Sequence, residues 1–303
     1  MKVFWKPIIA VFVFILMELL VGGIIGWIGV AAKFGEVGKA TMIALGLIIS
    51  GVLTVCILHR MKMIKWRVVN PKYISWRKAP LAIVGALMGI IAANLLNEKV
   101  DLPNSIEALM GNLCHSFWGV LAIAIIGPII EEIVFREGII GYLIRRGQHR
   151  WVAILFSALM FGIIHLNPAQ IPFAFIMGVV LGVVYVKSHS IVLTSIIHIL
   201  NNSIAVVETL ALGERANDIS YAELLGGSGI AWVYIIICTG LCILFLMEFW
   251  KQYHRKHITR NDEDEHHHHH HHNHHHNVEK LTAEIAQPQA DAIVKQDEEL
   301  VQP

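Results

Sequence analysis

The chain has 303 residues, of which 55% are hydrophobic and only 16% charged, and its mean hydropathy is +0.60. This composition excludes an ordinary soluble domain and predicts an integral membrane protein. The formal net charge of +1 shows no basic or acidic excess, which argues against nucleic acid as a partner and leaves membrane lipid as the main surroundings.

Apolar runs long enough to cross a bilayer recur along most of the chain. A transmembrane helix needs about 20 residues to span ~30 Å of hydrocarbon, and the backbone can satisfy its hydrogen bonds in lipid most simply as a helix. The sequence therefore predicts an all-α, polytopic transmembrane bundle of about eight spans. They are expected near residues 8–30, 40–58, 80–97, 117–144, 151–166, 171–187, 190–211 and 229–249.

Lysine and arginine gather in alternate loops of this arrangement. Because cytoplasmic loops carry the excess of these residues, the basic loop at 59–80 is predicted to be cytoplasmic. Counting spans outward from it places Arg145, Lys187 and Lys251 on the same side. We therefore expect both termini in the cytoplasm, and the bacterial character of the chain predicts the bacterial plasma membrane as its location.

Beyond about Arg260 the sequence becomes polar. An acidic stretch is followed by a histidine tract, 266–276, which is interrupted by Asn273, and then by a polar tail to Pro303. This composition is typical of disordered segments. The tract could bind zinc, nickel or copper, but it is separated from the spans, and we interpret 261–303 as a disordered, histidine-rich tail.

The fourth span contains two adjacent carboxylates, Glu131 and Glu132, in an otherwise apolar helix. Such groups are costly in lipid and are usually functional. Glu132 and Arg136 stand four residues apart, so they share a face and can neutralise each other, whereas Glu131 points about 100° away around the helix. A buried ion pair that fixes packing would explain Glu132 but not Glu131. Pro128 can kink the helix and release a backbone carbonyl nearby.

Two later spans carry further polar groups. Phe161 and His165 are one helical turn apart in the fifth span, and His198 and Asn202 are one turn apart in the seventh. Taken singly, a membrane histidine more commonly joins helices by hydrogen bonds. Together with Glu131 the set supplies a carboxylate and an imidazole that can activate water. It also supplies an imidazole and a carboxamide that can donate to an oxyanion, as amide hydrolysis requires.

The motifs EExxxR, FxxxH and HxxxN, in this order on separate helices, resemble those of the CAAX-protease and bacteriocin-processing (CPBP, or Abi) family. The resemblance covers roughly residues 121–207. This family includes the type II CAAX prenyl endopeptidases, which cleave a prenylated protein after its modified cysteine. The resemblance implies four segments, which are N-terminal transmembrane helices (1–116), a CPBP-like catalytic core (117–211), the last transmembrane helix with its flanks (212–260) and the tail (261–303).

The resemblance also implies roles for individual residues. Glu131 and His165 would activate the attacking water, and His198 with Asn202 would stabilise the oxyanion. The residues expected to support the site are Glu132, Arg136 and Phe161. No HExxH motif is present, so zinc would need Glu131, His165 and His198 from three helices as its ligands. We favour a reaction without a metal and leave zinc open.

The leading prediction is an intramembrane endopeptidase that hydrolyses a peptide bond in a membrane-associated or lipidated peptide or protein, in bacteriocin processing or self-immunity. The alternative is a non-catalytic membrane protein that confers immunity by binding. A small secondary transporter with an intramembrane carboxylate ranks last, because the chain shows no internal repeat. Glu18, the lone carboxylate of the first span, is interpreted as a packing or cavity residue.

Overall fold

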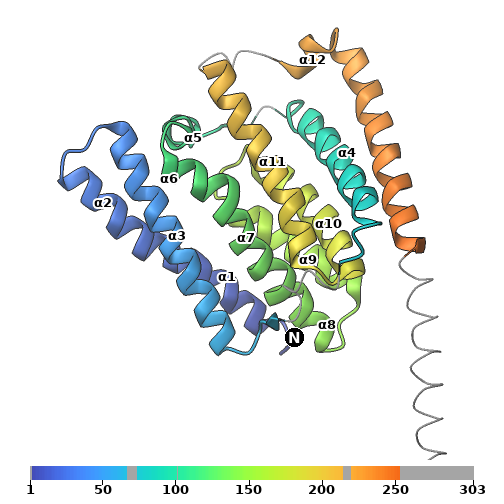
Figure 1. Ribbon diagram of the computed structural model, residues 1–303, viewed down its shortest axis with the longest axis horizontal. Coiled ribbons are helices and arrows are strands. Elements are labelled where there is room, and N and C mark those ends of the chain that lie inside the picture. Colours follow the sequence, from blue (N-terminus) through green and yellow to red (C-terminus); the bar gives the residue numbers. More distant parts are fainter. Residues whose placement is uncertain (1, 67–73, 101, 214–219, 253–303) are drawn as a thin grey trace, which may run out of the picture. The chain divides into compact units, whose positions relative to one another are not determined.

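The computed structural model describes residues 2–66, 74–100, 102–213 and 220–252. Within these ranges the regular elements are helices, and several short ones follow each other directly to form long helical stretches (Figure 1). The predicted all-α fold is therefore confirmed. Residues up to Trp250 form one compact unit. The predicted tail, 261–303, with its histidine tract, lies outside the described residues.

The helices follow the apolar runs of the sequence. The first three spans consist, in order, of α1 (Trp5–Met17), the π-helical segment η1 (Glu18–Gly22), α2 (Gly23–Ala31), α3 (Glu36–Arg60) and α4 (Ala79–Asn97). The elements that follow are α5 (Glu107–Cys114), α6 (Phe117–Val120), η4 (Leu121–Ile126), α7 (Gly127–Glu131), η5 (Glu132–Gly141), α8 (Tyr142–Arg145), α9 (Arg150–Ile163), α10 (Ile171–Ser188), α11 (Ile191–Leu212) and α12 (Tyr221–Leu224). The last described helix is Ser228–Gln252.

Within the described residues, seven helical stretches are long and apolar enough to cross a membrane. They correspond to seven of the predicted spans, and they make the chain an integral membrane protein. The remaining predicted span, 151–166, forms the shorter apolar helix α9, which has 14 residues. At about 1.5 Å per residue, α9 is about 21 Å long, which is less than the thickness of the hydrocarbon core.

The last helix, Ser228–Gln252, packs against α4 and runs in the opposite direction (Figure 1). A Cβ added at Gly89 would lie 2.7 Å from Sγ of Cys242, and one added at Gly85 would lie 2.9 Å from Cβ of Phe245. The two glycines therefore allow the helices to approach closely. The earlier glycine, Gly85, faces the later residue Phe245, and the later glycine, Gly89, faces the earlier residue Cys242, so the two helices are antiparallel. Their C-terminal ends therefore lie at opposite ends of the bundle.

Helix α9 and the loop after it connect these two ends. The guanidinium of Arg150, at the start of α9, lies 5.0 Å from the ring centroid of Trp250, near the end of the last helix. In the loop after α9, the carbonyl of Ala169 accepts a hydrogen bond of 2.9 Å from Nδ2 of Asn97, at the end of α4. The chain therefore passes from one end of the bundle to the other here, as the predicted span 151–166 requires.

Basic residues from separate elements meet at one end of the bundle. Lys6 Nζ donates to the carbonyl of Met61 at 3.2 Å, and Arg145 Nη2 donates to the carbonyl of Met63 at 2.5 Å. Both carbonyls lie in the segment that follows α3. The start of α1, the end of α3 and the end of α8 therefore share one end of the bundle, in agreement with the distribution of lysine and arginine in the sequence.

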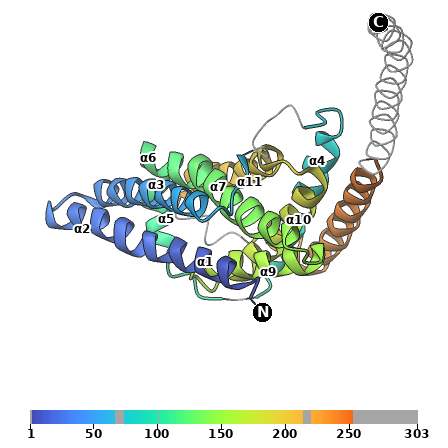
Figure 2. The ribbon, with the colours of Figure 1, turned by 90° about the horizontal axis from the view of Figure 1, so that it is seen from below.

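The first span and the span that carries Glu131 and Glu132 depart from regular α-helix. The segment η1 begins at Glu18, η4 ends just before the Gly127–Pro128 pair, and η5 begins at Glu132. Segments of π-helix are rare and occur frequently at functional sites. Views from two directions show α3 beside both α1 and α7, and α3 contacts all three of these irregular segments (Figures 1 and 2).

A row of buried aromatic rings fixes the motif-bearing helices relative to one another. Phe14 of α1 lies 6.0 Å from Phe135 of η5, measured between ring centroids, and Phe135 lies 5.2 Å from Phe161 of α9. Each pair is close to perpendicular, which is a favoured arrangement of aromatic rings. All three side chains are buried in the main core cluster. This core fixes the relative positions of α1, η5 and α9, which directly precede or follow Glu18, Glu131 and the turn that carries His165.

Candidate active site

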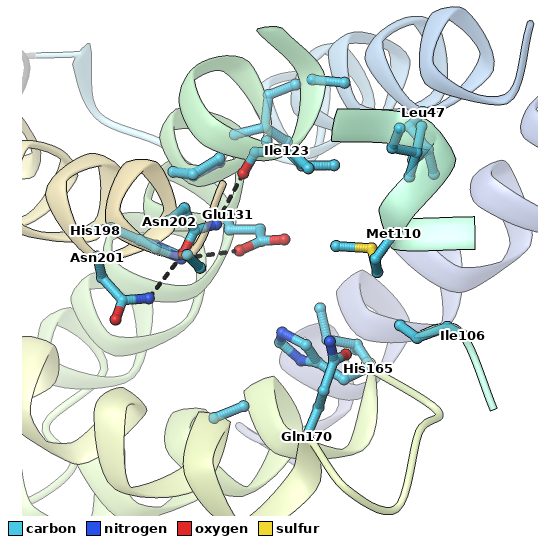
Figure 3. A pocket seen from close by; sticks show the side chains of 18 of the residues that line it. Leu47, Ile106, Met110, Ile123, Glu131, His165, Gln170, His198, Asn201 and Asn202 are labelled. Atoms are coloured by element: carbon cyan, nitrogen blue, oxygen red, sulfur yellow. Dashed lines mark hydrogen bonds and ion pairs between the residues drawn. The ribbon is translucent and has the colours of Figure 1, made fainter. Parts of the chain in front are cut away.

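One cavity of about 410 Å³ brings together the four residues predicted to be catalytic. Its walls are formed by residues of α1, η1, α3, α5, η4, α7, α9, α10 and α11 and by the loop after α9. In Figure 3 the side chains of Glu131 and His165 point into it from different walls. Its predicted members are Glu131, His165, His198 and Asn202, and Phe161 lines it as well. Residues from three separate motifs therefore face the same space.

Glu132 and Arg136 form a buried ion pair next to this cavity. Arg136 Nε donates to Glu132 Oε2 at 2.9 Å and Nη2 donates to Oε1 at 3.2 Å. Both side chains are 0% exposed. The guanidinium also lies 5.0 Å from the ring centroid of Phe161, which is within the range of a cation–π interaction. The i, i+4 pair that the sequence predicted is therefore present, and it lies behind the wall of the cavity.

His198 of α11 links the two adjacent carboxylates. Its Nδ1 lies 3.1 Å from Glu132 Oε1, and its Nε2 lies 3.5 Å from Glu131 Oε2. Glu132 is held by Arg136 as a carboxylate and can only accept hydrogen bonds, so Nδ1 of His198 is the donor. The other nitrogen, Nε2, lies within ion-pair distance of Glu131, so the protonation of the ring affects this carboxyl group. This geometry makes Glu131 and His198 a coupled acid–base pair.

His165 lies in the turn that follows α9, because this helix ends at Ile163. Its Nδ1 is 2.8 Å from the carbonyl of Phe161. A carbonyl can only accept, so Nδ1 carries the proton, and Nε2 of the neutral ring keeps its lone pair. The ring of Phe161 stands edge to face with both histidines, with centroid distances of 5.0 Å to His165 and 5.8 Å to His198. Phe161 therefore separates and orients the two imidazoles.

The carboxamide of Asn202 is anchored to the backbone of η4. Its Nδ2 donates to the carbonyl of Ile123 at 2.8 Å, and its Oδ1 accepts from Asn201 Nδ2 at 2.9 Å (Figure 3). In a π-helix the carbonyl of Ile123 would accept from the N–H five residues later, but that residue is Pro128, which has none. The sequence predicted that Pro128 would release a carbonyl, and the structure shows that Asn202 takes it. The second N–H of the same amide group is not used by this bond.

The residues considered as zinc ligands do not form a metal site in this arrangement. Among the described residues, no group of three or more His, Cys, Asp and Glu side chains is placed to hold a metal ion. Both ring nitrogens of His198 face carboxylates, and Nδ1 of His165 faces a backbone carbonyl. Glu131, His165 and His198 therefore line one cavity without forming a group that is placed to hold a metal ion.

The structure also shows a second buried carboxylate network, which the sequence analysis missed. Glu137 Oε1 accepts from Arg145 Nη1 at 2.5 Å and from the backbone N–H of Lys65 at 3.0 Å, and the hydroxyl of Tyr185 donates to Oε2. Glu137 is 0% exposed and does not line the cavity. The sequence did show a third carboxylate in this apolar helix, which could have indicated a buried network. Its partners could not be inferred, because they lie in three other segments of the chain.

The cavity is also lined by polar residues outside the predicted catalytic set, namely Glu18, Gln170, Asn201 and Thr209. Glu18 of η1 is one of them, which agrees with its interpretation as a packing or cavity residue. Gln170, in the loop before α10, was given no role from the sequence, and Asn201, beside Asn202, was interpreted as a residue that could join helices. The signal of Gln170 was weak, because a single amide side chain near the end of an apolar run has no characteristic spacing.

Comparison with known proteins assigns the central segment to a family. Residues 113–204, which contain all four predicted catalytic residues, match the family described as Type II CAAX prenyl endopeptidase Rce1-like. The chain is 37% identical over 90 residues to the membrane-embedded CAAX protease MroQ of Staphylococcus aureus, covering 28% of this chain and 36% of MroQ. It is 36% identical over 89 residues to the UPF0177 protein YbdI of Lactococcus lactis, covering 27% of this chain and 47% of YbdI. No solved structure matched the chain.

Residues 113–204 therefore form a CAAX-protease (CPBP) family domain, as the three motifs predicted. The similarity spans less than half the length of either of these relatives. The helices before it, α1, α3 and α4, lie outside the segment matched to the family, although α1 and α3 provide part of the cavity wall.

Proposed function

We propose that this protein is an intramembrane endopeptidase that hydrolyses a peptide bond in a membrane-associated or lipidated substrate. The observation that carries the proposal is the convergence of Glu131, His165 and His198 on one cavity within the membrane-spanning part of the chain. Glu131 is the central residue of the span Phe117–Arg145, where a carboxylate is most costly in lipid. Membership of residues 113–204 in the CAAX-protease family supports the same activity.

Water activation is assigned to Glu131 and His165. A water in the cavity can donate to the carboxylate of Glu131 and to the free Nε2 of His165, which face the space from different walls. One of these groups takes a proton as the water oxygen attacks the scissile carbonyl carbon. General base catalysis of this kind contributes about 10²–10⁴-fold to rate. Each base is held in place by a second contact, Glu131 by His198 and His165 by the Phe161 carbonyl.

Stabilisation of the oxyanion is assigned to groups on α11. His198 Nδ1 donates to Glu132, and this carboxylate stabilises a proton on the opposite nitrogen, Nε2, from which it can be donated to the oxyanion. The remaining N–H of Asn202 is a second donor. When the intermediate collapses, the C–N bond breaks and the proton taken from water passes to the leaving amine.

The walls opposite the carboxylates indicate an apolar substrate. Leu47 of α3, Met110 of α5 and Ile106, which directly precedes α5, line the side of the cavity that faces Glu131 in Figure 3. A substrate segment bound there would place apolar side chains or a lipid group against these residues. We propose bacteriocin processing or self-immunity as the context, and the bacterial plasma membrane as the location with both termini cytoplasmic. The two bacterial relatives support a bacterial setting.

Comparative membrane proteomics tests the activity. Cells that express the parent protein or Glu131→Gln are compared for peptides whose cleavage requires the parent. We expect at least one membrane-associated product that disappears in the variant and in His165→Ala, while Glu36→Gln, on the exposed start of α3, preserves it. If purified Glu131→Gln cleaved the same substrate as fast as the parent, the protease proposal would fail. Immunity that survived both site substitutions would favour a non-catalytic binding protein.

A further inference from the structure

Glu18 is a carboxylate that the proposed reaction does not use, although it lines the same cavity. It is the central residue of the span Trp5–Ala31, so it stands at mid-membrane, as Glu131 does in its own span. A charged or polar side chain at this depth is costly unless it faces protein or water. Glu18 meets that condition by lining the cavity, but facing the cavity does not explain why a carboxylate is there.

The position of Glu18 is set by its neighbours on both sides. Phe14, one helical turn earlier, packs against Phe135, so this face of α1 is directed at the core. Four residues later, Gly22 touches α3 so closely that a Cβ on Gly46 would lie 2.8 Å from the Gly22 Cα. Between these contacts the helix opens into the π-helical segment that starts at Glu18. The side chain is therefore directed at the cavity rather than at lipid.

The charge balance of the cavity differs from that of its surroundings. Glu132 forms an ion pair with Arg136, and Glu137 forms one with Arg145. Among the described residues, no basic side chain forms an ion pair with Glu18. The residues described as lining the cavity include Glu18 and Glu131 and contain no lysine or arginine. An apolar space with two carboxyl groups and no fixed cation is complementary to a ligand that brings a positive charge.

We propose that Glu18 is a specificity-determining residue that binds a lysine or arginine side chain of the substrate near the scissile bond. The inference rests on the proposed peptidase function and extends it by naming the substrate chemistry. The substrate cation would neutralise Glu18 at a depth where an unpaired carboxylate is most costly. Because Glu18 lies on η1 and Glu131 on α7, the same ligand can contact both walls while its backbone reaches the water-activating groups.

Cleavage-site profiling with a defined peptide pool tests this assignment. The peptide pool is made by digesting bacterial membrane proteins with a protease other than trypsin, so that internal lysine and arginine are retained. It is incubated in detergent with the purified full-length parent or with Glu18→Gln, Glu18→Lys or Glu36→Gln. We expect the parent to select peptides with a basic residue at one position near the cut. Glu18→Gln should lose that selection, Glu18→Lys should favour an acidic residue there, and Glu36→Gln should match the parent.

The kinetic form of the test uses one cleaved peptide and its glutamine-substituted counterpart. The ratio of kcat/KM for the basic peptide over the neutral one should fall about tenfold or more in Glu18→Gln, as expected for a lost charge-assisted hydrogen bond. If Glu18 acted only on the structure or on the charge of the site, and not on the substrate cation, Glu18→Gln would change kcat/KM for both peptides by the same factor. The ratio would then stay unchanged, and this inference would be wrong although the protein would still be a protease. If the parent cut no peptide in the pool, the peptidase function and this inference would both fall.

Discussion

His198 Nε2 lies 3.5 Å from Glu131 Oε2, on a helix that is 67 residues further along the chain. The contact pairs the carboxylate at the centre of one span with an imidazole whose other nitrogen is held by Glu132. Two adjacent glutamates thus have different surroundings. Glu132 is fixed by Arg136 behind the wall of the cavity, whereas Glu131 has an ionisable partner and faces open space. This difference allows separate predictions for the two residues.

Glu131→Gln and Glu132→Gln should affect activity and stability differently. Glu131→Gln should lower kcat about hundredfold or more, because it removes a general base, and should leave the free energy of unfolding nearly unchanged. Glu132→Gln should also destabilise the protein by about 3–5 kcal/mol, because it leaves the buried guanidinium of Arg136 without its counter-charge. Peptide cleavage and unfolding by SDS in mixed micelles measure the two effects. Equal loss of stability in both variants would contradict the distinction.

Replacing the ion pair by apolar residues separates its structural role from its role in the site. Arg136→Met alone should be strongly destabilising, whereas Glu132→Leu combined with Arg136→Met should recover much of the loss, since a buried pair can often be exchanged for well-packed apolar groups. Activity should stay low in the double variant, because His198 Nδ1 loses its acceptor. A double variant that regained both stability and cleavage would show that Glu132 does not position His198.

Asn202 and Pro128 should be energetically coupled through the carbonyl of Ile123. Asn202→Ala should cost about 1 kcal/mol of unfolding free energy, because it removes the partner of this carbonyl. In a Pro128→Ala background the cost should be smaller, since the new backbone N–H can bind the same carbonyl. A double-mutant cycle on unfolding measures the coupling. Additive effects would indicate that the proline does not leave this carbonyl to Asn202.

Chelation should not abolish peptide cleavage. Among the described residues, no group of three or more His, Cys, Asp and Glu side chains is placed to hold a metal ion, although Glu131, His165 and His198 line the same cavity. We therefore expect the same cleavage rate before and after treatment of the purified protein with 1,10-phenanthroline. The non-chelating 1,7-isomer serves as the control. A loss of cleavage that added zinc restores would establish a metal-dependent reaction and would require these side chains to rearrange.

Tyr185→Phe should lower stability while it preserves cleavage. The phenol donates to the buried carboxylate of Glu137, which also binds Arg145 and the backbone of Lys65 outside the cavity. Removing this donor should cost about 1–3 kcal/mol, and the segment after α3 should become more accessible to proteases. Limited proteolysis and unfolding in mixed micelles measure these effects, and kcat/KM at low temperature is the control. A selective loss of kcat with unchanged stability would instead connect this network to the reaction.

Much of the architecture follows from local sequence. Runs of apolar residues predicted the helices because a membrane leaves few other ways to satisfy the backbone. The spacing of Glu132 and Arg136 predicted their pairing because residues four apart share a helix face. Pro128 predicted a free carbonyl because it has no N–H. Each of these inferences depends on a few neighbouring residues and on helix geometry that is the same in every protein.

The tertiary structure decided which separate helices meet. No spacing in the sequence indicates that His198 contacts both Glu131 and Glu132, that Asn202 reaches Ile123, or that Glu18 faces the same cavity. These contacts depend on the packing of α1, α7 and α11 around buried rings and glycines, where small differences in crossing distance change which side chains touch. The sequence by itself therefore determined the membrane helices and the chemical groups available, whereas helix packing determined how those groups are combined in one cavity.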